Sequence, residues 1–116
     1  MRTFVNAVVS DYNRKHRQKV KFLVDTGSDN TVITDDIVRK LRLKIASREK
    51  VETANGIIIL PVAEIRIYLE GREMITRAWV LPSKSQPVIG ASTLETAGLS
   101  VDTKKGRLVK SNMIMY

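Results

Sequence analysis

The chain has 116 residues with no cysteine, one histidine and a formal net charge of +8 at pH 7. This composition excludes disulfides, thiolate metal sites, cysteine nucleophiles and any site that needs two histidines. Because no apolar run approaches the roughly 18 residues of a membrane span, we expect one soluble domain over residues 1–116, with no membrane partner. A cysteine-free chain that opens on a strand pattern rather than a signal peptide also predicts a cytoplasmic protein.

Two strands joined by a basic turn are the first elements that the sequence predicts. Apolar side chains alternate with other residues along positions 5–9 and 20–24, which is the period of a strand with one buried face. Between them, residues 14–19 are almost all basic. Clustered Lys and Arg suit nucleic-acid phosphates, but charge runs usually mark solvated faces, and we interpret this one as an exposed hairpin tip.

The second strand runs directly into Asp25, and Thr26, Gly27 and Ser28 follow. A carboxylate at the buried end of an apolar strand is costly unless it is paired or functional. An acid in an ordinary turn is the alternative for an isolated Asp-Thr-Gly. The longer pattern of apolar strand, acid, hydroxyl, glycine and hydroxyl favours a functional carboxylate at position 25.

A short helix and a hairpin come next. Thr34 is a suitable N-cap, and acids and then bases follow it in the order that the helix dipole favours, so we expect a helix over residues 35–41. Asn55-Gly56 separates two apolar runs. Because this dipeptide tolerates positive φ at both central positions of a turn, it predicts a hairpin turn centred on Asn55 and Gly56.

The second half of the chain resembles the first. Strands over residues 65–69 and 75–81 flank a turn at 70–71, and Val88-Ile89 precede Ser92-Thr93-Leu94-Glu95, which has the pattern of a capping box. The helix that it opens should end near Gly98, and closing strands are predicted around Leu99, Val101, Leu108, Val109 and residues 113–116. At an offset of 56 residues Val32 coincides with Val88 and Ile33 with Ile89, which supports a strand–loop–helix unit that occurs twice.

The segment from Phe22 to Ser28 resembles the active-site loop of pepsin-like and retroviral aspartic proteases. Because the motif occurs once, the nearer resemblance is to the retropepsins, half-size enzymes that work as dimers. It covers residues 3–102, with residues 51–59 in the place of the flap hairpin and residues 88–90 in the place of an apolar-apolar-Gly segment. The resemblance implies a mostly-β fold, a closed barrel of the acid-protease type with one or two short helices, and a homodimer.

The resemblance also implies roles for single residues. Asp25 would be the catalytic acid, and Thr26 would hydrogen-bond across the two-fold axis. Gly27 lets backbone approach, and Ser28 would donate a hydrogen bond to Asp25, which predicts an acid-shifted pH optimum by analogy with pepsin-like members. The substrate-binding residues would be Asp29, Asn30, Val32, Ala54, Asn55, Gly56 and Val88, with residues 54–56 at the flap tip.

The implied chemistry needs two copies of Asp25. One ionised carboxylate is a weak base near neutral pH, whereas two carboxylates about 3 Å apart share a proton and divide the roles of base and acid. We therefore expect an aspartic endopeptidase that acts on an extended peptide or protein substrate, with no metal and no organic cofactor. Two alternatives stay open: a catalytically silent retropepsin-like dimerisation or peptide-binding module, and, less favoured, a small basic domain that binds nucleic acid.

The chain also departs from the retroviral pattern. Many retroviral enzymes have Arg-Asn or Arg-Asp after the glycine of the second motif, whereas this chain has Ala91-Ser92. Since that arginine helps to hold the retroviral dimer together, the assembly must be secured differently. Residues 104–116 extend beyond the usual retroviral end, and the predicted flap is short and lacks a Gly-rich tip.

Overall fold

The computed structural model describes residues 2–111, and most of them lie in strands, as the sequence predicts. In chain order the strands are β1 (Thr3–Ser10), β2 (Arg17–Val24), β3 (Thr31–Thr34), β4 (Ile45–Thr53), β5 (Gly56–Leu69), β6 (Arg72–Leu81), β7 (Val88–Ile89), β8 (Leu99–Asp102) and β9 (Arg107–Lys110), and the helices are α1 (Asp35–Leu41) and α2 (Ala91–Ala97). The closing strand predicted at residues 113–116 lies outside the described residues. Neither helix in the described part is long and apolar enough to cross a membrane.

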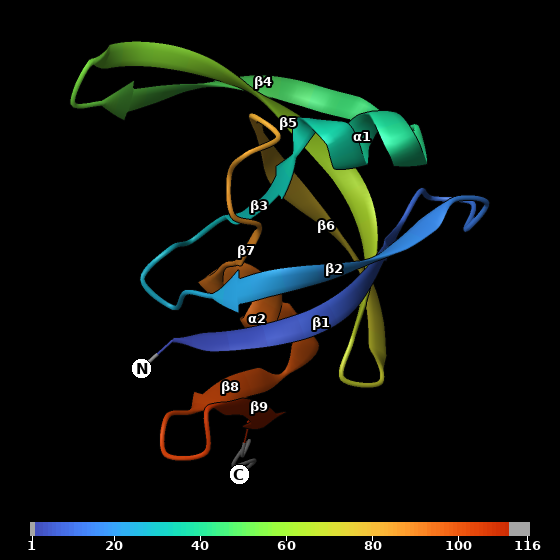
Figure 1. Cartoon of the computed structure of the whole chain (residues 1–116), viewed down its shortest axis with the longest axis vertical. Helices are drawn as coiled ribbons and strands as arrows, with labels where there is room; N and C mark the ends of the chain where they lie inside the picture. The colour runs from blue at the N-terminus through green and yellow to red at the C-terminus, as the bar shows by residue number, and fades with distance from the viewer. Residues whose placement is uncertain (1, 112–116) are drawn as a thin grey trace, which may run out of the picture.

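Seven strands form one curled sheet in the order β1-β2-β7-β3-β6-β5-β4 (Figure 1). The first strand also pairs with β5, through residues 8–10 of β1 and 66–68 of β5. The first strand in the order thus also pairs with β5, the last but one, which bends the sheet round toward itself. Closure into a complete barrel remains a prediction. The β4–β5 hairpin extends away from the body, and β8 and β9 form a separate two-stranded sheet at the opposite end (Figure 1).

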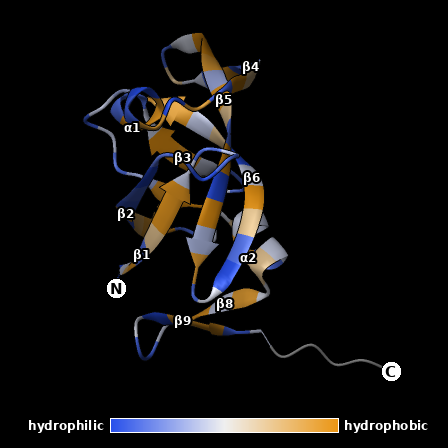
Figure 2. Ribbon diagram, turned by 90° about the vertical axis from the view of Figure 1, so that its right-hand side faces the viewer, coloured by the Kyte–Doolittle hydropathy of each residue, from blue (hydrophilic) through white to orange (hydrophobic). Residues whose placement is uncertain are grey.

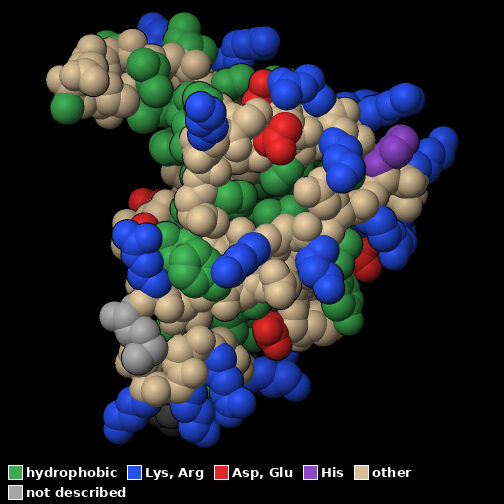
Figure 3. All heavy atoms as spheres, in the orientation of Figure 1, with side chains coloured by type: hydrophobic (Ala, Val, Ile, Leu, Met, Phe, Trp, Pro, Cys, Tyr) green, Lys and Arg blue, Asp and Glu red, His purple; other side chains and the backbone are tan. Residues whose placement is uncertain are grey.

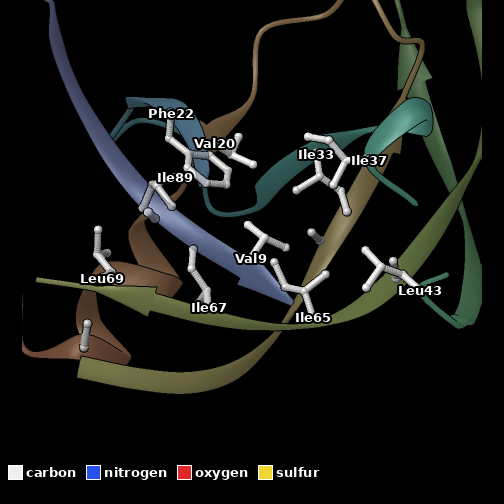
Figure 4. Close-up of a cluster of buried hydrophobic side chains, with 14 of the residues drawn as sticks. Val9, Val20, Phe22, Ile33, Ile37, Leu43, Ile65, Ile67, Leu69 and Ile89 are labelled. Atoms are coloured by element: carbon white, nitrogen blue, oxygen red, sulfur yellow. The ribbon is translucent and has the colours of Figure 1, made fainter. Parts of the chain in front are cut away.

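The core lies on the inner face of the curled sheet. Apolar and polar residues alternate along the strands (Figure 2), because successive side chains of a strand point to opposite faces. The largest side chains that are almost fully buried include Leu41 and, as labelled in Figure 4, Phe22, Ile33, Ile65, Ile67, Leu69 and Ile89. Each such side chain contributes about 1.5–3 kcal/mol when it leaves water, so this cluster is the main support for the loops outside it.

The predicted helix over residues 35–41 is confirmed as α1. Thr34 occupies its N-cap position but makes no side-chain bond to the helix backbone. A hydrogen bond from Thr34 instead lowers the pKa of the Asp36 carboxyl. The helix ends at Arg42, which has a φ of 53° in the left-handed region.

The internal repeat is visible in the structure. The helices α1 and α2 are both seven residues long, and their bounds differ by the 56 residues of the sequence repeat. Their C-caps, Arg42 and Gly98, show the same offset and are both left-handed. Arg14 and Glu70, in the β1–β2 and β5–β6 turns, are also 56 residues apart and both have positive φ. Each half therefore has the same order of hairpin, strand and short helix.

Two local predictions are wrong by one or two residues. In the β4–β5 hairpin Thr53 pairs with Gly56, so Ala54 and Asn55 occupy the turn, and of the two predicted positions only Gly56 has positive φ. The capping box is also wrong, because α2 begins at Ala91 with Gly90 at the N-cap. Ser92 therefore lies inside the helix, where its hydroxyl is free to bond another part of the chain.

Candidate active site

The loop that follows β2 holds Asp25 by its own backbone. The N–H of Gly27 donates to the Oδ1 of Asp25 over 3.0 Å, and the N–H of Ser28 donates to the carbonyl of Asp25 over 3.2 Å. A Cβ on Gly27 would lie 3.3 Å from that Oδ1, which is why a glycine suits the position. Asp25, Thr26 and Gly27 are exposed in the single chain, so the carboxylate is not buried as the apolar strand suggested.

The second half of the chain supports this loop from behind. The N–H of Asp25 donates to the carbonyl of Ile89 over 3.0 Å, and the N–H of Ala91 donates to the carbonyl of Ser28 over 2.7 Å. The hydroxyl of Ser92 donates to the carbonyl of Asp29. These bonds join residues more than sixty positions apart in sequence, so the orientation of the loop depends on β7 and the start of α2.

Gly90 lies in close contact with the loop that carries Asp25. A Cβ at this position would lie 2.5 Å from the carbonyl carbon and oxygen of Asn30. No side chain fits at that separation without moving the backbone. The close approach also explains why the chain enters α2 at Gly90 rather than at Ser92.

A buried group of threonines lies beneath the same contact. Thr31 and Thr93 are both 1% exposed, and their hydroxyls are 2.6 Å apart. The Oγ1 of Thr31 also accepts from the N–H of Gly90 over 3.1 Å, and Thr76 lies 3.3 Å from Thr93. Because buried polar groups are costly without partners, this cluster fixes β3 against β7 and α2.

The predicted role of Ser28 is wrong in one respect. Its hydroxyl donates to the carbonyl of Asn30 over 2.9 Å rather than to the carboxylate of Asp25. The donor to that carboxylate is the backbone of Gly27. Ser28 therefore stabilises the shape of the loop, and its contact gives no support to the predicted acid-shifted pH optimum.

An apolar row crosses the sheet on the face opposite the core. Residues that pair directly across neighbouring strands point to the same face of the sheet. The pairings across β2, β7, β3, β6 and β5 join, in that order, Leu23, Val88, Val32, Trp79 and Val62. We call these five residues the apolar row. Asp25 lies two positions beyond Leu23 and therefore on the same face. Leu23, Val88 and Trp79 are partly exposed, whereas Val32 and Val62 are buried in the single chain.

The row continues onto the projecting hairpin. Leu60 and Ile58 follow Val62 at every second position of β5, and Ile58 pairs with Val51 of β4. Figure 3 shows this hairpin standing out from the molecular surface with hydrophobic side chains on it, and the outline is indented below it. The indole Nε1 of Trp79 donates to the Oε2 of Glu49 on β4 over 2.8 Å, which links the base of the hairpin to the row.

The residues predicted from the sequence thus fall into two groups. Asp25, Thr26, Gly27, Ser28, Asp29 and Asn30 lie in one loop, with Val32 and Val88 beside it in the apolar row, while Ala54, Asn55 and Gly56 lie at the separate hairpin tip. Sequence reasoning missed Ser92, Thr93 and Trp79, whose side-chain hydrogen bonds are all made with distant segments. Leu23 was the one residue that local alternation with Asp25 could have indicated. Within residues 2–111 no group of three or more His, Asp or Glu side chains could hold a metal ion.

Comparisons with known proteins agree with this geometry. A family model described as a gag-polyprotein putative aspartyl protease matches residues 14–96. Among solved structures, the chain is similar to EIAV protease in complex with the inhibitor HBY-793, with a TM-score of 0.63 and 17% identity, over 99% of this chain and 94% of that one. It is also similar to the retroviral protease-like domain of Ddi1 from Leishmania major, with a TM-score of 0.61 and 17% identity, over 96% of this chain and 90% of that one. A search of curated proteins finds no match.

Proposed function

Because the chain belongs to the gag-polyprotein putative aspartyl protease family, we propose that it is a homodimeric aspartic endopeptidase with one Asp25 from each copy in a single active site. The observation that carries this proposal is the exposed carboxylate of Asp25, oriented by the N–H of Gly27 at the end of the apolar row. An exposed acid beside an apolar surface suits a site that a second copy completes. The proposed unit is the whole chain, residues 1–116, as one domain whose sheet closes into a barrel.

The proposed reaction divides two proton transfers between the two carboxylates. Like charges about 3 Å apart do not ionise together readily, so the pair holds one proton. The ionised member takes a proton from a bound water, whose oxygen attacks the peptide carbonyl carbon, while the protonated member gives its proton to the carbonyl oxygen. The tetrahedral intermediate then breaks its C–N bond: the protonated carboxyl gives its proton to the leaving nitrogen, and a hydroxyl of the intermediate gives its proton to the ionised carboxylate, so the pair again holds one proton.

The proposed substrate is an extended peptide with apolar side chains next to the scissile bond. Gly27, Asp29 and Asn30 would bond the peptide backbone, since extended chains are recognised mainly through main-chain hydrogen bonds. Val32 and Val88, as parts of the apolar row, would accept the side chains. The hairpin tip at residues 54–56 would close over the peptide and exclude water. The reaction would use no metal and no organic cofactor.

The proposed dimer is isologous, the commonest arrangement of two identical chains. Its two-fold axis would pass between the two loops that carry Asp25. Thr26, which is exposed in the single chain, would hydrogen-bond across that axis. This contact would place the two carboxylates at the separation that the shared proton needs.

The test is a cleavage assay on unstructured protein substrates from about pH 3 to pH 7, with and without pepstatin-type inhibitors. Asp25→Asn should abolish cleavage and leave the unfolding temperature close to that of the wild type. The control is Asp35→Asn, which makes the same chemical change at an exposed position on α1 and should retain full activity. Cleavage that persists in Asp25→Asn would place the chemistry elsewhere. A wild-type dimer that binds such inhibitors but cleaves nothing would assign the chain to the alternative, a peptide-binding module without turnover.

A further inference from the structure

A basic hollow lies on the outer face of β1, β2, β5 and β6, away from the active-site loop. Ser10 of β1 pairs with Arg17 of β2 on one side and with Arg66 of β5 on the other. Residues that pair across neighbouring strands point to the same face, so the short side chain of Ser10 has one arginine on each side. Val8, two positions earlier on β1, continues the floor of the hollow. Long side chains beside a strand of short ones leave a depression between them.

We call this depression the arginine hollow, and its volume is about 290 Å³. Arg14 from the β1–β2 turn is its third arginine, and Tyr68 and Glu73 complete the wall. Figure 3 shows Lys and Arg side chains gathered around the tip of the β1–β2 hairpin, at the right of the view. The hollow therefore carries three guanidinium groups and one carboxylate.

Two of the three arginines are already fixed in place. Arg66 donates from Nε and Nη2 to the carbonyl of Tyr12 over 3.2 and 3.0 Å, and its guanidinium lies over the ring of Tyr12. Arg66 and Arg14 both donate to the same Oε1 of Glu73, over 3.3 and 2.8 Å. The side chain of Arg66 is only 15% exposed. A ligand that met these groups would therefore cost little side-chain entropy to bind.

The positive charge of Arg17 is not neutralised by a carboxylate of the hollow. Arg17 is exposed, and no ion pair of this residue is found among residues 2–111. With one carboxylate against three guanidinium groups, the hollow has an excess of two positive charges. Planar guanidinium forks bind tetrahedral oxyanions through paired hydrogen bonds better than a point charge does. A doubly charged phosphate group would match both the excess charge and the geometry.

We propose that the arginine hollow binds a phosphate group, carried either by a small phosphate compound or by a phosphorylated side chain. The site is separate from the proposed active site. Arg17 is the first residue of β2 and Asp25 follows its last, so the two lie about 26 Å apart at 3.3 Å per residue. The hollow would therefore stay open in a dimer whose axis passes beside Asp25.

The experiment is calorimetric titration of the full chain with inorganic phosphate at constant ionic strength. The expected result is saturable binding with a Kd at or below about 1 mM. Arg17→Gln should weaken this binding about tenfold, because it removes a charge-assisted hydrogen bond from an exposed residue. Lys104→Gln, an equal change of charge on the exposed β8–β9 turn, should leave the Kd unchanged. In NMR spectra, phosphate should shift the amide signals of Ser10, Arg17 and Tyr68.

A second titration identifies the source of the phosphate. A short phosphoserine peptide that binds more tightly than inorganic phosphate, while its unphosphorylated form does not bind, would indicate a phosphorylated chain. Equal or weaker binding of the phosphopeptide would indicate a small phosphate compound. The proposal is overturned by an absence of saturable binding, by equal losses in Arg17→Gln and Lys104→Gln, or by amide shifts confined to other parts of the chain. None of these outcomes depends on whether the protein cleaves peptides.

Discussion

At the scale of single residues, the position of Asp25 depends on a glycine that is far away in the sequence. Gly90 lies against the backbone of Asn30, and the neighbouring Ile89 and Ala91 bond the loop on both sides of this contact. The loop that carries Asp25 is therefore joined to β7 and the start of α2 by backbone hydrogen bonds. A substitution at Gly90 should shift the carboxylate of Asp25 indirectly, by moving the loop.

Gly90→Ala should destabilise the fold by about 1–3 kcal/mol, as overpacking in a tight contact does, and should lower the cleavage rate per folded molecule. The cause is displacement of Asn30 and of the loop that ends there. Thermal unfolding and the rate on a peptide substrate measure the two effects. The control is Gly71→Ala, whose φ of +77° brings strain at an open position. It should lose stability and keep its cleavage rate; an equal loss of rate in both variants would contradict the role given to Gly90.

Ser28 provides a second test at this scale. Its hydroxyl bonds the carbonyl of Asn30 and not the carboxylate of Asp25. Ser28→Ala should therefore cost about 0.5–1.5 kcal/mol of stability, the usual worth of one hydrogen bond, while the pH–rate profile keeps its shape and position. Parallel measurements of unfolding and of cleavage across the pH range check both statements. A displaced acid limb in Ser28→Ala would mean that the hydroxyl reaches the carboxylate in the active protein.

At the scale of elements, one carboxylate joins the two hairpins that the internal repeat relates. Glu73 on β6 accepts hydrogen bonds from Arg14, in the β1–β2 turn, and from Arg66 on β5. The hydrogen bond from Arg14 is the main cause that holds the pKa of Glu73 below its ordinary value of 4.5. Since the folded pKa is the lower one, this contribution to stability is present above pH 4.5 and is lost as the pH falls through the folded pKa.

Glu73→Gln should therefore be less stable than the wild type at about pH 7, and the difference should shrink as the pH falls below the ordinary glutamate pKa. The effect should be small, because the group is exposed and screened by solvent. Denaturant unfolding at a series of pH values gives the comparison. Glu95→Gln on the exposed face of α2 is the matched control and should differ little from the wild type at any pH. A wild-type advantage over Glu73→Gln that is the same at all pH values would rule out the ionised contact as its cause.

The same scale shows what the sequence could and could not predict. The helix over residues 35–41 and the strand alternation were predictable, because their signals are local and agree with the packing. The capping box at Ser92 was a local signal that a distant contact overrode, since Gly90 must lie against Asn30. The sequence predicts the hairpin turn one residue too late, at Asn55 and Gly56 rather than at Ala54 and Asn55. The Asn-Gly pair is compatible with both placements, and only the pairing of β4 with β5 selects between them.

At the scale of the whole molecule, the site required contacts that no local pattern contains. The apolar row joins residues from five strands, and its order follows from the topology of the curled sheet. The position of Asp25 directly after β2 was predictable, because an apolar strand that ends in Asp-Thr-Gly-Ser is a specific pattern. Its supports, Thr31, Thr93 and Ser92, and the link from Trp79 to Glu49 join segments far apart in the chain.

The internal repeat also shows why the proposed mechanism calls for a second copy of the chain. Each half has a hairpin, a strand and a short helix. In the first half the segment between β2 and β3 carries acids, whereas the equivalent segment between β6 and β7 in the second half has none. The position in the second half that is equivalent to Asp25, 56 residues later, is Leu81. A pair of carboxylates therefore cannot form within the described chain by the symmetry of its own halves. In the proposed dimer the partner would supply the second carboxylate, and with it the other wall of the substrate site.

The most direct test of this account mixes wild-type and Asp25→Asn chains. Equal amounts carrying different tags are unfolded together, refolded and assayed for cleavage, and recovery of doubly tagged pairs shows that mixed dimers have formed. If the active site needs both copies of Asp25, the mixture should retain about a quarter of the activity of the same total amount of wild-type protein, because one dimer in four carries two aspartates. Retention of about one half would show that each chain acts alone, and would contradict the shared site.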